Sequence, residues 1–111
     1  MKYYNVTFHL DKEMEETGIA YLQAVYIPQM LASGVLGAPL VRRVKAFPNE
    51  RGLQEEEEKS CSYALQFPLS NEAAFPAFIR EESVAIHAAL GRKFGGRMLG
   101  FATLLEELEW K

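Results

Sequence analysis

Apolar and polar side chains alternate along residues 3–10, and this period of two predicts a β-strand. The stretch is also rich in aromatic and β-branched residues, which favour strands. One face of the predicted strand carries Tyr4, Val6, Phe8 and Leu10, and the other carries Tyr3, Asn5, Thr7 and His9. We expect the first face to pack in the core, so the functional question is what the second, more polar face meets.

A helix is predicted from Asp11 to about Ser33, where apolar residues recur at spacings of three and four. The side chain of Asp11 is placed to cap its start, and Gly34 is placed to end it in a left-handed conformation. Pro28 lies inside this helix, has no N–H group and crowds the carbonyl of Ala24. We therefore expect a kink or a broken turn there.

Three further strands are predicted at residues 39–47, 61–69 and 97–105, with a second helix before the last of them. The order βαββαβ is typical of the ferredoxin-like split βαβ sandwich, an α+β fold. Both helices then cover one face of a four-stranded antiparallel sheet, and the strands at 3–10 and 61–69 lie in the middle. The whole chain, residues 1–111, forms a single domain in this interpretation.

The second helix begins at a cap formed by Ser70 or Asn71, or at Pro76, and ends at Gly95. Before it, residues 47–60 are rich in turn formers and glutamate. Calcium-binding loops alternate their ligands with Gly or Asn, and this glutamate run does not. We expect a solvated loop.

The polar face of the sheet has few of the charged residues that usually solubilise a surface. To the polar residues of the first strand, the strand at 61–69 adds Ser62, Ala64 and Gln66. The last strand adds residues of the type Gly100 and Ala102, or Phe101 and Thr103, because its pattern does not define its register. An antiparallel sheet can leave such a face to water. Because the central strands lack Lys and Glu here, we expect it instead to meet a second copy, closing a two-fold dimeric barrel with a polar-lined interior.

Composition excludes several classes of function. The 111 residues are 49 % hydrophobic and carry a net charge of −3, with no dense basic patch of the kind that binds nucleic acid. No stretch approaches the roughly 20 apolar residues that cross a bilayer. The one cysteine, Cys61, cannot form an intramolecular disulfide. A cytoplasmic protein is expected.

Short motifs along the chain match those of a known family. They are YNVT at 4–7, IP at 27–28, ML at 30–31, SG at 33–34, KFGGR at 93–97 and FATLLE at 101–106. On these residues the chain resembles a family of small uncharacterised bacterial proteins of the dimeric α/β-barrel superfamily. That superfamily also contains antibiotic-biosynthesis and quinol monooxygenases, haem-degrading enzymes and stress-responsive barrel proteins. The resemblance implies a ferredoxin-like fold and a dimer, but no reaction.

One position departs from the pattern of that family. A histidine precedes the Ile-Pro pair in the family, and this chain has Tyr26 there. A phenol does not titrate near neutral pH. A role of that histidine as general base or haem ligand is therefore not carried over to this chain.

The residues that we expect to bind a ligand are Asn5, Thr7, His9, Tyr26 and Gln66. The first hypothesis is a dimer that binds a small organic molecule inside the barrel. The alternatives are a cofactor-independent monooxygenase-like or isomerase-like enzyme, with His9 as base and Tyr26 as hydrogen-bond donor, and an interaction module without a ligand. No cofactor, metal site or catalytic residue is assigned, because two histidines and one cysteine suit no common metal-binding motif.

Two further side-chain positions are predicted from the pattern alone. Arg42 and Arg43 point to opposite faces of their strand, so at most one of them lines the polar face. His87 is expected on the surface of the second helix, because its apolar neighbours account for the packing.

Overall fold

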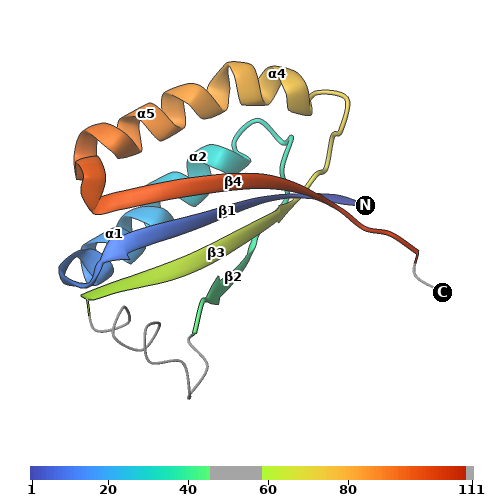
Figure 1. Cartoon of the computed structure of the whole chain (residues 1–111). Coiled ribbons are helices and arrows are strands. Elements are labelled where there is room, and N and C mark those ends of the chain that lie inside the picture. The colour runs from blue at the N-terminus through green and yellow to red at the C-terminus, as the bar shows by residue number, and fades with distance from the viewer. Residues whose placement is uncertain (46–58, 110–111) are drawn as a thin grey trace.

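The computed structural model describes residues 1–45 and 59–109, which form a four-stranded antiparallel sheet with helices over one face (Figure 1). The strands are β1 (Lys2–Asp11), β2 (Leu40–Arg43), β3 (Ser60–Pro68) and β4 (Met98–Glu106), in the order β2-β3-β1-β4. The two predicted central strands are thus confirmed. The second strand is shorter than expected, and most of the predicted acidic loop lies outside the described residues.

Two helical segments lie on the same face of this sheet (Figure 1). The first consists of η1 (Lys12–Met14), α1 (Glu15–Tyr21), η2 (Leu22–Tyr26) and α2 (Ile27–Leu31), and the second of α4 (Phe75–Arg80), α5 (Glu82–Phe94) and the short turn η3 (Gly95–Arg97). Strand order and helix placement are those of the ferredoxin-like sandwich that the sequence predicts. Within the described residues, no helix is long and apolar enough to span a membrane.

The first helical segment contains the irregular turn expected near Pro28. In η2 the backbone is π-helical, and the N–H of Ile27 donates to the carbonyl of Leu22, five residues back. Pro28 follows immediately and has no N–H with which to continue a regular ladder. This turn of the helix therefore contains one residue more than an α-helical turn, which is the usual form of a single-turn π-bulge.

The core lies between the helices and the sheet. Every even-numbered side chain from Tyr4 to Leu10 is buried there, and Phe8 contacts the ring of Tyr26 edge-on at 5.0 Å between centroids. From β3, Tyr63, Leu65 and Phe67 pack on the same side. This confirms which face of each central strand is apolar.

The predicted helix caps are partly confirmed. Gly34 has a φ of +78°, the left-handed conformation expected at the end of the first segment. Asn71 accepts a hydrogen bond from the N–H of Ala74 at 3.2 Å, just before α4. Asp11 makes no side-chain cap, contrary to expectation; its Oδ2 instead accepts from Nε of Arg97 at 3.3 Å, because β4 begins beside it.

Gly18 lies where α1 packs closely against the sheet, and a substitution there tests this contact. A Cβ there would overlap Cδ2 of Leu10 and lie 2.8 Å from Cε of Met98, and both of these side chains are buried. Gly18→Ala is therefore expected to destabilise the fold by about 1–3 kcal/mol, although alanine normally favours a helix interior by about 1 kcal/mol.

Gly91→Ala on α5 is the matched control, because a Cβ there meets nothing within 4 Å. It is expected to stabilise the protein by about 0.5–1 kcal/mol. Urea unfolding of both variants measures the difference. A Gly18→Ala protein as stable as the Gly91→Ala protein would contradict the close contact.

Candidate functional site

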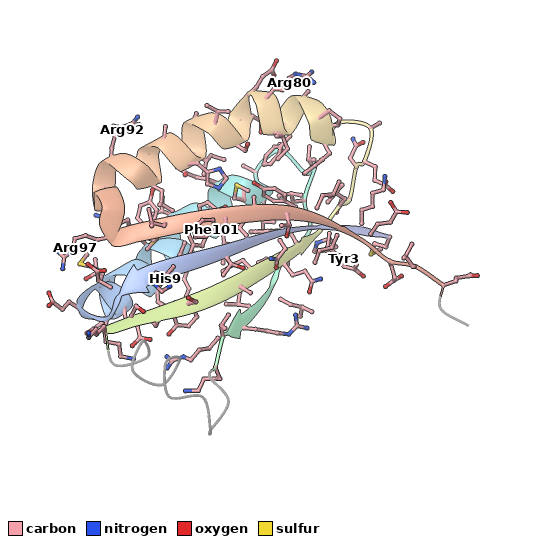
Figure 2. The ribbon with its side chains drawn as sticks, in the orientation of Figure 1. Tyr3, His9, Arg80, Arg92, Arg97 and Phe101 are labelled. Carbon is pink, nitrogen blue, oxygen red and sulfur yellow. The ribbon has the colours of Figure 1, made fainter. Side chains whose placement is uncertain are left out.

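The uncovered face of the sheet, which we call the open face, is the first candidate site. Its side chains come from all four strands in paired register: Tyr3, Asn5, Thr7 and His9 on β1, Ser62, Ala64 and Gln66 on β3, Leu99, Phe101, Thr103 and Leu105 on β4, and Leu40 and Arg42 on β2. Figure 2 shows Tyr3 and His9 near opposite ends of β1, with Phe101 on the neighbouring strand.

The polar centre of the open face is partly hydrogen-bonded within itself. Nδ1 of His9 lies 2.8 Å from Oγ of Ser62, directly across from it on β3. Nδ2 of Asn5 donates to Oγ1 of Thr7 at 3.4 Å, a long contact. These side chains are half-buried by their neighbours. The Nε2 atom of His9 has no hydrogen-bond partner in the described part of the chain, so it can meet water or a ligand.

The side chains of the two consecutive arginines of β2 lie on opposite faces of the sheet, as the alternation predicts. Arg42 lies on the open face, where its Nη1 donates to Oε1 of Gln66 at 3.0 Å. Arg43 lies on the helix side, where its Nη2 donates to Oε2 of Glu15 at 3.0 Å. The cation that lines the open face is therefore Arg42.

Large apolar side chains flank this polar centre on both outer strands. The register of β4 puts Phe101 and Thr103, not Gly100 and Ala102, on the open face, paired with Thr7 and Asn5. Four such apolar side chains, 40–62 % exposed, are Leu40, Leu99, Phe101 and Leu105. The open face thus has a polar middle and apolar flanks.

Tyr26 is not brought together with the other four predicted ligand residues. It is fully buried on the helix side of the sheet, and its hydroxyl lies 2.7 Å from Nε2 of His87. Asn5, Thr7, His9 and Gln66 do share the open face. The pairing of His9 with Tyr26 on one substrate is therefore wrong within a single chain.

His87 is turned inward rather than lying on the helix surface, which corrects the prediction. Its ring bonds to Tyr26 and to the backbone of Ser83, and burial lowers its pKa. Burial likewise raises the pKa of Tyr26. The signal was present in the sequence, because Ser83, His87, Leu90 and Phe94 follow one another at spacings of four, three and four.

A second polar cluster, which the sequence did not indicate, joins α1 to β2 and β3. The hydroxyl of Tyr63 donates to Oε2 of Glu15 at 2.5 Å, and Nζ of Lys12 lies 3.2 Å from Oε1 of the same carboxylate. The bond from Tyr63 is the main reason that the pKa of Glu15 falls to about 2. Cys61 lies nearby, and burial raises the pKa of its thiol, which disfavours a reactive thiolate.

Metal ligands do not gather in the described part of the chain. Within residues 1–45 and 59–109, no three His, Cys, Asp or Glu side chains are close enough to hold an ion. The open face itself offers hydrogen-bonding side chains, apolar surface, the imidazole of His9 and the guanidinium of Arg42.

Strand order, helix placement and a polar open face define a ferredoxin-like α+β domain. The chain belongs to the family described as "Domain of unknown function (DUF4286)", whose model matches residues 1–108. This confirms the resemblance to a small uncharacterised family. Among solved structures, the chain is similar to the crystal structure of HapK from Hahella chejuensis, with a TM-score of 0.63 and 15 % identity over 100 % of this chain and 96 % of that chain. At that identity the likeness shows the fold alone. No curated protein matches the sequence.

The acid stability of the fold is expected to depend on Glu15. Its pKa is lowered from 4.5 to about 2 in the folded chain, so its contribution to stability is present above pH 4.5 and is lost as the pH falls toward 2. Glu15→Gln should therefore flatten the fall in unfolding free energy across this range.

Urea unfolding at a series of pH values measures this effect. Glu16→Gln is the matched control, because Glu16 is an exposed glutamate next to Glu15 on α1. The control should retain the pH dependence of the wild type. Equal slopes for the wild type and Glu15→Gln would show that the bond from Tyr63 does not hold the carboxylate ionised.

Proposed function

We propose that two copies of the chain pair through their open faces and that the enclosed chamber binds a small polar organic molecule. The observation that carries this proposal is the division of the open face into apolar flanks and an uncharged polar centre. Apolar flanks favour burial against another surface. A hydrogen-bonding centre between them favours a ligand over a second dry core.

The case for a second copy as the partner rests on symmetry and charge. A two-fold contact brings the same patch together from both chains, so the patch must suit itself. Among the open-face residues named above, Arg42 alone is charged, and it lies on the edge strand β2, where its Nη1 donates to the neutral amide oxygen of Gln66. Two copies therefore meet with little charge repulsion, and the exposed side chains of Leu99 and Phe101 lose their contact with water.

The class of ligand follows from the groups at the centre. Asn5 and Gln66 each offer a donor and an acceptor, Thr7 offers a hydroxyl, and His9 offers a ring nitrogen. Arg42 lies at the edge of this group and suits one anionic substituent on the ligand. We therefore propose a small, polar, neutral or singly anionic organic molecule.

The enzyme hypothesis has less support than the binding hypothesis. His9 lies on the open face and Tyr26 on the helix side, so they do not form an acid–base pair. The hypothesis of an interaction module without a ligand differs from the binding hypothesis in one respect: side chains of the two copies fill the space between the open faces. A cytoplasmic location suits a chain whose one cysteine, Cys61, is a buried thiol.

The oligomeric state tests the first half of the proposal. In light scattering coupled to size exclusion, the wild type is expected at twice the 12.6 kDa mass of the chain. Phe101→Glu places a charge in the apolar flank and should give the monomer mass. Val84→Glu is the control: Val84 on α5 is 58 % exposed, close to the 62 % of Phe101, but lies on the other side of the sheet, so this variant should remain a dimer. A monomeric wild type would remove the chamber.

Ligand retention and binding test the second half. Native mass spectrometry of the wild-type dimer should reveal an added small-molecule mass. Thr7→Val keeps the side-chain volume and removes the hydroxyl, so it should weaken the binding of that molecule about two- to tenfold. Thr17→Val, an exposed position on α1, should leave its Kd unchanged. A dimer that retains nothing, and that no polar metabolite stabilises against heat, would favour the interaction module.

A further inference from the structure

A cleft of about 320 Å³ lies on the helix side of the sheet, between α5 and the inner face of β4. Its walls include Tyr4, Phe8, His87, Gly91, Gly100 and Ala102. Figure 1 shows α5 running above β4 and β1, on the side away from the open face. The cleft is complete within one chain and does not depend on the proposed dimer.

Short side chains create this space. The helix side of β4 carries Gly100 and Ala102 opposite Gly91 of α5. A Cβ added at Gly91 would meet nothing within 4 Å, whereas one at Gly100 would lie 2.9 Å from Cε1 of Phe8. Phe8 therefore closes the floor, and the volume above it is open. The volume falls in the lower part of the range typical of small-molecule sites.

The polar group left for a ligand is the hydroxyl of Tyr4. His87 is occupied, because its ring bonds to the hydroxyl of Tyr26 and to the backbone of Ser83. Tyr4 is 7 % exposed, and its hydroxyl makes no hydrogen bond within the described residues. Among the described residues, every fully buried polar side-chain atom has a hydrogen-bond partner. The hydroxyl of Tyr4 has none, so it must be in contact with solvent. Tyr4 lines the cleft, so the cleft is where we expect that contact.

The lining of the cleft disfavours a charged ligand. Apart from His87, whose pKa burial lowers, and Tyr4, whose pKa burial raises, no titratable side chain is among the lining residues, and the remaining walls are apolar side chains and glycine. An ionised group placed there would lose hydration without gaining a counter-charge. The rings of Tyr4 and Phe8 offer flat apolar surface instead.

We propose that this cleft binds one neutral, mostly apolar molecule of about one or two fused rings, held by a single hydroxyl or carbonyl oxygen that bonds to Tyr4. The apolar walls supply the affinity, and the lone phenol orients the ligand.

Three matched probes test the class of ligand by calorimetric titration: 1-naphthol, naphthalene and 1-naphthoate. For the wild type, 1-naphthol should bind with a Kd about two- to tenfold below that of naphthalene, because of one added hydrogen bond. The anion 1-naphthoate should bind least well. Binding of 1-naphthoate at least as tight as that of 1-naphthol would overturn the proposal, as would the absence of binding by all three probes.

Three variants test the location. Tyr4→Phe should bring the Kd of 1-naphthol to that of naphthalene without changing the latter. Gly91→Leu should fill the cleft and abolish binding of both, with its fold checked by circular dichroism. Ala88→Leu, on an exposed part of α5 outside the lining, should bind as the wild type does. Equal 1-naphthol binding by the wild type, Tyr4→Phe and folded Gly91→Leu would place the probe elsewhere and overturn the proposal.

Discussion

Burial of one face of β1 is the constraint on which the rest of the structure depends. Val6, Phe8 and Leu10 are at most 1 % exposed, and β1 is paired on both sides, with β3 and β4. Because side chains alternate along a strand, a slip of one residue would bring Asn5 and Thr7 into the core. The content of the open face is therefore a consequence of what the other face of the same strand buries.

The polar pair of Tyr26 and His87 meets a second requirement of that core. A phenol buried against Phe8 and Phe67 needs a hydrogen-bond partner, and His87 supplies one from the other helical segment. Burial raises the pKa of the tyrosine and lowers the pKa of the histidine, so it favours the neutral form of both groups. The pair thus joins the two helical segments through one buried hydrogen bond between neutral groups.

The fold and the faces of the central strands could be predicted because alternation is local information. The register of β4 could not, because its sequence contains apolar residues at both odd and even positions. Contacts between distant residues, such as that of Tyr63 with Glu15, leave no trace in local spacing. The helix cap predicted at Asp11 was wrong for a similar reason, because Asp11 instead bonds to Arg97, which is 86 positions away in the sequence. Four of the five predicted ligand residues share a face because they follow the alternation, whereas Tyr26 belongs to the helical segment that covers the opposite face of the sheet and is buried there against Phe8.

In the middle of β4, the small side chains face the helices and the large apolar side chains face away from them, the reverse of the usual arrangement in a sheet with one face covered by helices. Toward the helices it presents Gly100 and Ala102, and toward the open face it presents Phe101 and its large neighbour Leu99. A strand that served only the core would place its large side chains under α5, where they would fill the cleft. Placing them outward leaves volume on one side of the sheet and exposed apolar surface on the other. One feature of the sequence thus accounts for both candidate binding surfaces, and because those surfaces lie on opposite faces, a ligand under α5 and a partner against the open face do not compete for the same side chains.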